Sequence, residues 1–353
     1  MNEPWKIVGF LVAVVVVYLL FWPTTVDPIA YRPPERPKME GVLAPNTELH
    51  KAELLAKGEI YGPEDVVIDS LGRIYGGTLD GKIVRILEDG AVEVFAETGG
   101  RPLGLAFDRN GHLIVADSGR GLLSIDPAGE ITVLSTEAEG VPYMFADHLD
   151  IASDGMIYFS DASFKYGQDE YLYDLLESRP NGRLLRYDPE TGTTEVLMRD
   201  LFFANGVALS KNEDFVLVNE TYRYRIQRYW LTGPQAGTAE VFVDNLPGFP
   251  DNITSNRRGT FWLALFTVRN DIMDAMHPYP FVKKVVARLP AFLWPKPEPY
   301  GLVLAINEEG EIILSLQDPG GKHLKEITGA REHEGFLYLG SLHNDRIGKY
   351  RLE

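Results

Sequence analysis

Residues 155–162 read GMIYFSDA, and five other stretches repeat this pattern of an initial turn residue followed by aromatic, β-branched and small residues. The six stretches are GRIYGGTL (72–79), GHLIVADS (111–118), GMIYFSDA (155–162), DFVLVNET (214–221), GTFWLALF (259–266) and GFLYLGSL (335–342). Five of the six begin at glycine after polar residues, as expected where a chain reverses between antiparallel strands. We interpret each stretch as the second strand of a hairpin.

Each repeated strand has neighbours that complete a small sheet. The preceding strand reads EDVVID, LGLAFD, DHLDIA, NGVALS, DNITSN or, in the most divergent copy, TGAREH, and several copies are followed by a third strand such as KIVRIL or RLLRYD. A repeated unit of about 50 residues with about four strands is typical of a propeller blade. The sequence therefore predicts an all-β protein in which residues 48–353 form a six-bladed β-propeller.

Two spacings between the repeats are long. The repeats start 39, 44, 59, 45 and 76 residues apart, and the excess falls near residues 163–181 and 267–300, which have partly helical patterns. Insertions in a repeat array gather on one rim, which is often the binding face. The sequence leaves two interpretations open. The insertions either only pack against the propeller, or form a substrate lid or a cap that touches the membrane.

The N-terminal segment predicts a transmembrane anchor. Residues 7–22, IVGFLVAVVVVYLLFW, carry no charge and are followed by Pro23. At about 1.5 Å per residue this stretch covers about 24 Å, slightly less than the ~30 Å hydrocarbon core, so Trp5 and Trp22 would lie at the interfaces. A cleaved signal peptide is the main alternative, but no small-x-small cleavage site follows the apolar stretch.

The flanking residues predict the domain order and the topology. Residues 1–24 would form a cytoplasmic tip and the anchor, and the Pro-rich residues 25–47 would form a stiff, extended stalk. Lys6 and the terminal amine oppose Glu3, which favours a single-pass protein with an extracytoplasmic propeller, in a periplasm, a lumen or the extracellular space. The absence of cysteine is compatible with a bacterial periplasm.

Composition excludes several classes of function. The net charge is −17, the wrong sign for a nucleic-acid-binding protein. Without cysteine there is no disulfide framework, thiolate metal site or cysteine nucleophile, and no GxSxG nucleophile elbow is present. Any chemistry must use oxygen and nitrogen groups. The sequence gives no indication of the oligomeric state.

One position, about eight residues before each repeated strand, brings the six repeats together, because equivalent residues of innermost strands point toward the channel of a propeller. Its occupants are Glu64, Leu103, Asp147, Asn205, Asp251 and Thr328. Three carboxylates and one carboxamide in one channel would repel one another unless a cation lay among them. Calcium suits such ligands because it takes six to eight oxygens in flexible geometry, whereas zinc prefers histidine or thiolate.

We therefore predict a Ca²⁺ site in the channel. The candidate metal ligands are Glu64, Asn205, Asp251, Asp147 and the neighbouring Asn252. His148, which follows Asp147, would lie within reach of the same cavity. The alternative is that these acidic residues cap turns or form hydrogen bonds between blades.

Several stretches carry a family resemblance. They include GPEDVVID from Gly62, IYFSDAS from Ile157, FANGVALS from Phe203, RIQRYWLTGPQAGTAEVFVDNLPGFPDNI from Arg225, and DPIAYRPP after the anchor. They are similar to the strictosidine synthase-like proteins, including the membrane-anchored adipocyte plasma membrane-associated protein branch. The wider superfamily holds gluconolactonase (senescence marker protein 30) and paraoxonase. The resemblance covers nearly the whole chain.

This resemblance implies a six-bladed propeller with a calcium ion in its channel. The family holds the ion with the Glu of a GPE motif, the Asn of an NG pair and the Asp of a PD pair, which match Glu64, Asn205 and Asp251. Where relatives carry an Asn-Asp pair, this chain has Asp147 followed by His148, so one ligand would change type.

Two departures from the family bear on activity. The histidine of paraoxonase-type lactonases corresponds to Leu103 here, so that machinery is not carried over. The catalytic Glu of strictosidine synthase falls near Thr328, which argues against amine-aldehyde condensation.

The predicted function is a calcium-dependent hydrolase, an esterase, arylesterase or lactonase acting on a small, fairly apolar ester or lactone. Calcium would polarise the carbonyl group while a carboxylate or imidazole takes a proton from the attacking water. Asp251 and His148 are the candidate catalytic residues. The alternative is a non-catalytic, calcium-stabilised binding propeller at the membrane surface, and a condensing synthase is the least favoured of the three.

Overall fold

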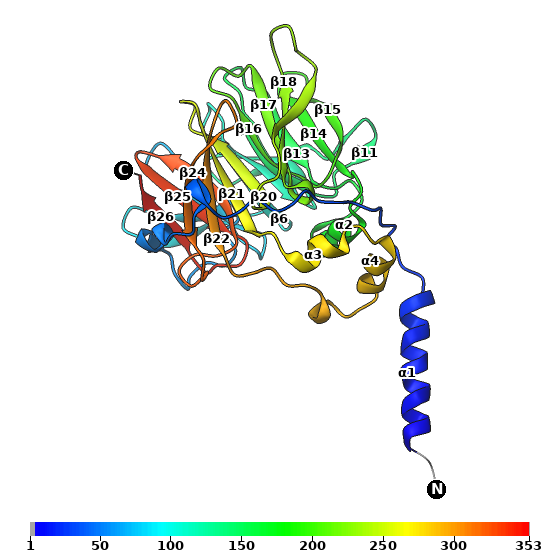
Figure 1. The fold of residues 1–353 in the computed structure, drawn as a ribbon. Coiled ribbons are helices and arrows are strands. Elements are labelled where there is room, and N and C mark those ends of the chain that lie inside the picture. The colour runs from blue at the N-terminus through cyan, green and yellow to red at the C-terminus, as the bar shows by residue number, and fades with distance from the viewer. Residues whose placement is uncertain (1–3, 353) are drawn as a thin grey trace.

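A computed structural model describes residues 4–352. Glu3, one of the residues on which the predicted topology depends, lies outside the described residues. Within this range the chain forms six four-stranded antiparallel sheets, a two-stranded hairpin and a long N-terminal helix that stands away from them (Figure 1). The sheets are arranged as the blades of a six-bladed β-propeller, which confirms the fold predicted from the repeats.

The first three blades run outward from the axis in chain order. Blade 1 is β2 (Val66–Ile68), β3 (Ile74–Gly77), β4 (Lys82–Ile86) and β5 (Val92–Glu97). Blade 2 is β6 (Arg101–Phe107), β7 (Leu113–Ser118), β8 (Gly121–Ile125) and β9 (Ile131–Ser135). Blade 3 is β12 (Ala146–Ile151), β13 (Ile157–Asp161), β14 (Gly182–Asp188) and β15 (Thr193–Leu201), preceded by the hairpin β10 (Glu137–Ala138) and β11 (Val141–Pro142).

Blades 4 and 5 follow the same plan, and blade 6 closes the ring. Blade 4 is β16 (Ala204–Leu209), β17 (Phe215–Glu220), β18 (Arg225–Trp230) and β19 (Ala239–Val243). Blade 5 is β20 (Gly248–Ser255), β21 (Thr260–Val268), β22 (Gly301–Asn307) and β23 (Ile312–Asp318). Blade 6 is β24 (Ile327–His333), β25 (Phe336–Ser341), β26 (Ile347–Arg351) and β1 (Glu53–Leu55).

Ring closure joins the two ends of the propeller. The first strand β1 pairs antiparallel with the last strand β26, with Leu54 opposite Gly348. The outermost strand of blade 6 therefore comes from the start of the domain, so the ring is held shut by hydrogen bonds between distant parts of the chain.

Glycine lets the innermost strands approach one another. A Cβ atom on Gly206 would lie 2.6 Å from the carbonyl oxygen of Asp251 and closer still to the backbone nitrogen of Ile253, both in the next blade. A Cβ atom on Gly104 would lie 2.6 Å from the Cα atom of His148. Such close backbone contact requires glycine, and it brings the inner strands together around the axis.

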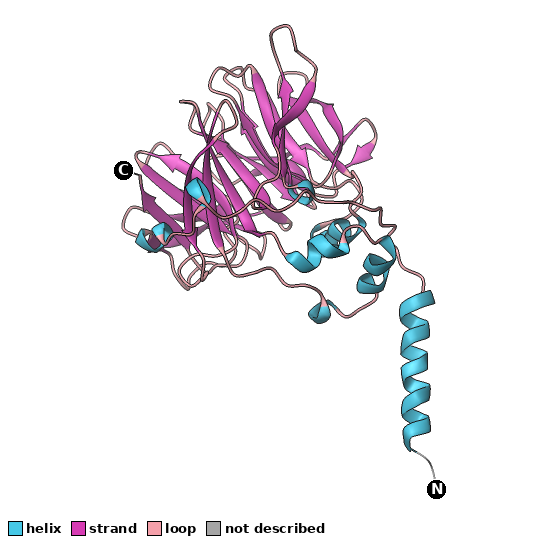
Figure 2. Ribbon diagram, in the orientation of Figure 1, coloured by secondary structure: helices cyan, strands magenta, loops and turns pink. Residues whose placement is uncertain are grey.

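The two insertions form a helical cap on one side of the propeller (Figure 2). The first contains the short 3₁₀ helix η3 (Gln168–Glu170) and α2 (Tyr171–Glu177). The second contains α3 (Asp271–Met276), α4 (Pro280–Ala287) and η5 (Ala291–Leu293). The remaining 3₁₀ helices are η1 (Gly41–Leu43), η2 (Glu48–Lys51) and η4 (Thr221–Arg223).

The cap has its own apolar contacts. Leu176 of α2 and Met273 and Met276 of α3 form a buried cluster with Val26, which precedes the propeller. The Asn270 side chain accepts hydrogen bonds from the backbone nitrogens of the first turn of α3, as an N-cap residue does. The two insertions thus pack together as one unit.

The predicted stalk is extended but does not stand free. The backbone nitrogen of Ile29 donates to the carbonyl oxygen of Glu177 (3.0 Å), and Gln317 Nε2 donates to the carbonyl oxygen of Leu43 (3.1 Å). The Pro-rich composition predicted the extended backbone but not the docking, because the partners lie far away in the sequence. The segment therefore lies on the cap and the propeller instead of separating them from the anchor.

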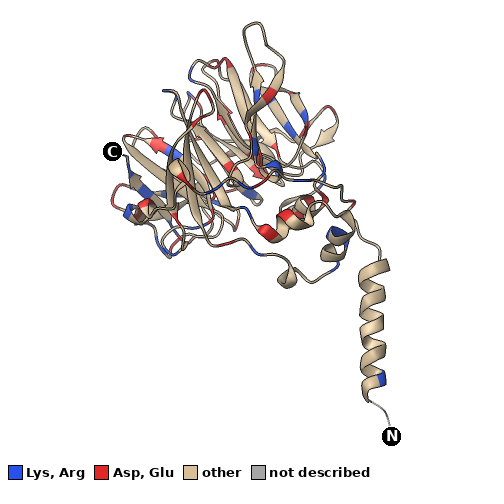
Figure 3. Ribbon diagram, viewed as in Figure 1, with Lys and Arg blue, Asp and Glu red and all other residues tan. Residues whose placement is uncertain are grey.

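The N-terminal helix α1 (Pro4–Phe21) has 18 residues and is apolar on all sides and exposed. It is long and apolar enough to cross a membrane, and it is compatible with membrane anchoring. Figure 3 shows it almost free of charge, with a basic residue near its N-terminal end. The side of the membrane on which the propeller lies stays a prediction.

Candidate functional site

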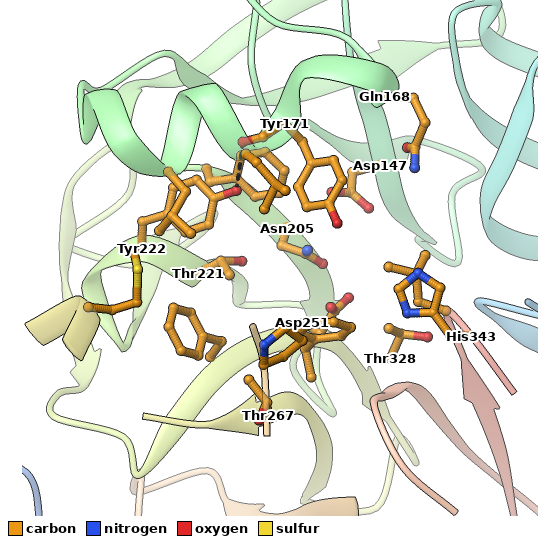
Figure 4. Close-up of a pocket in the computed structure, with 18 of the residues that line it drawn as sticks. Asp147, Gln168, Tyr171, Asn205, Thr221, Tyr222, Asp251, Thr267, Thr328 and His343 are labelled. Carbon is orange, nitrogen blue, oxygen red and sulfur yellow. Dashed lines mark hydrogen bonds between the residues drawn. The ribbon is translucent and has the colours of Figure 1, made fainter. Parts of the chain in front are cut away.

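A cavity of about 270 Å³ lies at the centre of the propeller, next to the helical cap. It is lined by all six residues at the predicted register position, namely Glu64, Leu103, Asp147, Asn205, Asp251 and Thr328. Figure 4 shows the side chains of Asp147, Asn205 and Asp251 turned toward the same space. The sequence register thus correctly grouped residues that come from six different blades.

β-bulges aim these side chains into the channel. The pairing of β12 with β13 shifts register between Ala146 and Leu149, where Asp147 lies. Equivalent shifts occur around Asn205 in β16 and around Asp251 in β20. A bulge adds a residue to one strand and re-aims its side chain, so the same local irregularity delivers a polar group from each of these blades.

Four oxygens of this group are buried without a hydrogen-bond partner among the described residues. They are Glu64 Oε2, Asp147 Oδ2, Asn205 Oδ1 and Asp251 Oδ1. Buried polar atoms are normally hydrogen-bonded, and leaving one unpaired costs about 1–3 kcal/mol. Four unpaired acceptors lining one cavity fit the oxygen-rich donor set that calcium takes.

The donor set includes an amide as well as carboxylates. Across residues 4–352, no group of three or more His, Asp or Glu side chains is by itself arranged to hold a metal ion. The carboxamide of Asn205 lines the cavity together with the carboxyl groups of Asp251 and Glu64. Any cation held here would therefore need the carboxamide together with the carboxylates.

Burial and mutual repulsion raise the pKa values of the three carboxyl groups. Burial raises the pKa of Glu64 well above its ordinary value, and the nearby Asp251 raises it further. Burial followed by the charge of Glu64 does the same to the pKa of Asp147. The buried Arg101 guanidinium lowers both values, and a cation bound among the three carboxyl groups would lower them further.

Asn252 and His148 do not line the cavity. Asn252 is buried and donates from Nδ2 to Glu64 Oε1 (3.1 Å), so it orients a candidate ligand. His148 is buried and accepts at Nδ1 from the backbone nitrogen of Val207 (3.0 Å), while its Nε2 lies 3.7 Å from Asp65 Oδ2. Both residues lie in the bulged parts of their strands, and their side chains bond to other blades instead of lining the cavity. The expectation that both would reach the cavity was wrong.

His343 also lines the cavity, although it is not among the residues predicted for the site. Its Nδ1 lies 2.8 Å from Glu326 Oε2. Because a carboxylate only accepts, this nitrogen donates the hydrogen bond. Burial alone would raise the pKa of Glu326, but the hydrogen bond and charge of His343 and the charge of Lys325 hold it below its ordinary value. The only sequence signal was a histidine just after a repeated strand.

The rest of the cavity wall is largely apolar and aromatic. Phe203 stacks on Tyr222 with ring centroids 4.5 Å apart, and Phe145 meets Phe203 edge-on at 5.3 Å. The cap adds Tyr171, Leu172, Leu175, Met273 and Trp294. Such a wall suits an apolar ligand with a few polar atoms that reach the channel residues.

The fold and the site thus define a class: a six-bladed propeller with an apolar N-terminal helix and a polar channel that opens into a largely apolar cavity. The profile of the strictosidine synthase family matches residues 147–234, that of the strictosidine synthase-like N-terminal region matches residues 41–86, and that of the NHL repeat matches residues 100–125.

Two relatives establish the family to which the chain belongs. The adipocyte plasma membrane-associated protein of Rattus norvegicus is 38% identical over 353 residues, which cover 93% of this chain and 93% of that protein. Protein strictosidine synthase-like 6 of Arabidopsis thaliana is 37% identical over 307 residues, covering 84% of this chain and 80% of that protein. The chain belongs to the family of strictosidine synthase-like and adipocyte plasma membrane-associated proteins.

Solved structures share the fold at low identity. A gluconolactonase from Xanthomonas campestris has a TM-score of 0.64 and 18% identity, with 94% of this chain and 98% of that chain covered. The calcium-binding protein regucalcin from Agrobacterium tumefaciens has a TM-score of 0.59 and 15% identity, with 85% and 92% covered. At these identities the likeness concerns the fold alone.

Proposed function

We propose that this protein is a calcium-dependent hydrolase of small, fairly apolar esters or lactones. The observation that carries the proposal is the group of four unpartnered oxygens, from Glu64, Asp147, Asn205 and Asp251, facing a largely apolar cavity. Calcium, when bound by these oxygens, would polarise the substrate carbonyl and stabilise negative charge on its oxygen.

The donor chemistry supports calcium over other metals. The four groups supply only oxygen, which suits Ca²⁺ and not Zn²⁺. A cation would also favour the ionised form of the three carboxyl groups, whose pKa values burial raises. The names of the two solved structures with the same fold, a gluconolactonase and a calcium-binding protein, agree with both parts of the proposal.

Two side chains would accept a proton from the attacking water. Asp251 lines the cavity with an unpartnered Oδ1. His343 lines it as well, and Glu326 holds its ring and would stabilise the imidazolium formed on proton transfer. The aromatic residues of the wall would bind the apolar part of the substrate and exclude water from it. His148 has no place in this scheme because its ring does not reach the cavity.

A calcium-stabilised propeller that binds a ligand without turning it over is the second candidate. Leu103 favours it, because an apolar residue occupies the register position of blade 2, where the paraoxonase type has a histidine. The same channel oxygens would then serve stability and ligand binding only.

Hydrolysis assays on the full-length protein in nanodiscs separate the two candidates. The substrates are aryl acetates and aliphatic lactones, each with added calcium or with a calcium chelator. We expect turnover that chelation abolishes and that is lost in Asp251→Asn. Glu130→Gln, which alters an exposed carboxylate away from the cavity, should behave like wild type. If no substrate is turned over while chelation still lowers the melting temperature, the binding propeller is correct.

A further inference from the structure

Exposed apolar side chains gather on the second insertion. Tyr279, Phe281, Val282, Phe292 and Leu293 are all more than a third exposed, and Phe292 reaches 72%. We call these five residues the insertion patch. Large aromatic and aliphatic side chains exposed together in this way mark a surface that meets a membrane or another molecule.

The insertion that carries the patch adjoins the end of the transmembrane helix. Arg288, directly after α4, donates from Nε to the carbonyl oxygen of Trp22 (2.6 Å) and from Nη1 to that of Leu19 (3.0 Å). The hydroxyl of Tyr18 lies 3.4 Å from the carbonyl oxygen of Arg288. The cap is therefore continuous with the last turn of α1, on the side from which α1 leaves the propeller (Figure 1).

No spacer separates the helix from the cap. The helix ends at Phe21, and Val26 is already buried among the cap helices. Lys283 Nζ then donates to the carbonyl oxygen of Ile29 (2.8 Å). A helix of this length, at about 1.5 Å per residue, spans nearly the whole hydrocarbon core of about 30 Å, so its C-terminal end lies at the level of the lipid headgroups.

Charge supports contact with a lipid surface. Between residues 275 and 297 the sequence has four basic residues and no acidic one, in a chain whose net charge is −17. Lys284, Arg288 and Lys296 are at least partly exposed, whereas the fourth, Lys283, is buried and donates to Ile29 and Ser178 inside the cap. Basic residues beside exposed aromatic ones are typical of segments that lie in a membrane interface, because the cations meet anionic headgroups while the rings enter the acyl boundary.

We propose that the insertion patch lies in the surface of the bilayer that α1 enters, so that the cap is a second, monotopic membrane contact. Its partner is a lipid surface with anionic headgroups. The docked segment before the propeller and the Arg288 contacts fix the patch against that surface.

This placement also assigns a class of substrate, and that part depends on the function proposed above. The segment that carries Phe292 and Leu293 also lines the cavity through Ala291, Trp294, Pro295, Lys296 and Pro297. The cavity wall and the membrane contact are thus made by the same stretch of chain. The substrates favoured by this arrangement are esters or lactones that partition into the bilayer.

Single labelled cysteines test the membrane contact directly, because the chain contains no cysteine. Val282→Cys and Val241→Cys form a matched pair, since the two valines are 42% and 44% exposed and Val241 lies on the outer strand of blade 4. Each full-length variant is labelled at its cysteine with a polarity-sensitive dye. It is then reconstituted in nanodiscs of phosphatidylcholine with some phosphatidylserine. Part of the lipid carries a spin-label quencher near the headgroup.

We expect blue-shifted emission and several-fold stronger quenching by the labelled lipid at position 282 than at position 241. Equal quenching at the two positions would overturn the proposal. A blue shift at position 282 that ignores the lipid quencher but depends on protein density would also overturn it, because the patch would then contact a second copy or another protein.

Phe281→Ser combined with Phe292→Ser tests the assigned class of substrate, since neither residue lines the cavity. We expect slower hydrolysis of a long-chain ester embedded in the bilayer and unchanged hydrolysis of a water-soluble aryl acetate. An equal loss of hydrolysis rate on both substrates would refute the assignment of substrates that partition into the bilayer. If wild type hydrolyses neither substrate, the proposed function fails, while the quenching result still decides the membrane contact.

Discussion

Asn252 Nδ2 donates a hydrogen bond to Glu64 Oε1 over 3.1 Å, although 188 positions separate the two residues in the sequence. Asn252 belongs to blade 5 and Glu64 directly precedes β2 of blade 1, so the contact links the two blades that flank blade 6. It fixes one carboxyl oxygen of Glu64 and leaves Oε2 unpartnered. A residue behind the cavity wall thus orients a group inside it.

Asn252→Leu should weaken calcium binding without unfolding the propeller. Leucine keeps a similar volume but cannot donate to Glu64, and losing an outer-shell partner of a metal ligand typically costs about 10–100-fold in affinity. Calorimetric titration with calcium measures the change. Asn110→Leu, in an exposed turn of blade 2, is the control and should bind as wild type does. Equal affinity in both variants would mean that Asn252 does not orient a ligand.

Gly206→Ala should destabilise the channel. The added methyl group would press on the backbone of Asp251 and Ile253, and overpacking of this kind costs about 1–3 kcal/mol. The melting temperature should fall, and calcium binding should weaken with it. Gly167→Ala is the matched control, because its Cβ would lie 3.6 Å from the nearest atom, the carbonyl oxygen of Met144. An unchanged melting temperature for Gly206→Ala would contradict the close packing described here.

Stability should fall with pH, because the unfolded chain takes up a proton on His277 before the folded cap does. Burial, with the nearby Lys283 charge, lowers the pKa of His277 to about 3, whereas an unfolded chain has a histidine pKa near 6.5. The unfolded state therefore takes up the proton first, and this residue alone removes about 1.4 kcal/mol per pH unit as pH falls from about 6.5 toward 3. Denaturant unfolding at pH 7.5 and pH 5 should show a smaller drop for His277→Gln than for wild type, and an identical drop would refute the assignment.

His343→Gln should lower kcat by about 10²–10⁴-fold, the usual contribution of a general base. Glu326→Gln should lower kcat less, and KM should change little in either variant, because the substrate contacts stay. His333→Gln, outside the cavity lining, is the control and should retain wild-type kinetics. If His343→Gln keeps full activity, Asp251 alone remains as the acceptor of the proton.

The fold and the centre of the site could be predicted from the sequence because both repeat. Glu64, Asn205 and Asp251 occupy the same register position, so a comparison of the repeats grouped them without any knowledge of contacts. His148 lies one residue after that position, in the bulge of its strand, and its ring bonds to Val207 of the next blade instead of lining the cavity. Comparison of the repeats therefore predicts which residues at the shared register position line the cavity, but it does not predict where the side chains of their sequence neighbours point.

The remaining features depend on contacts between segments that do not repeat. The docking of Ile29 on Glu177 and the pairing of His343 with Glu326 bring together residues from an insertion, a linker and a loop. Composition gives the conformation of each segment but not its partner. Composition consequently predicted a stiff, extended stalk but not its contacts with the cap.

A crystal of the full-length protein grown with calcium, with the ion located by its anomalous scattering, tests the central claim most directly. The account predicts one ion in the propeller channel, at about 2.3–2.6 Å from side-chain oxygens of Glu64, Asp147, Asn205 and Asp251. A channel that holds no ion at saturating calcium, with these side chains paired to one another instead, would contradict it.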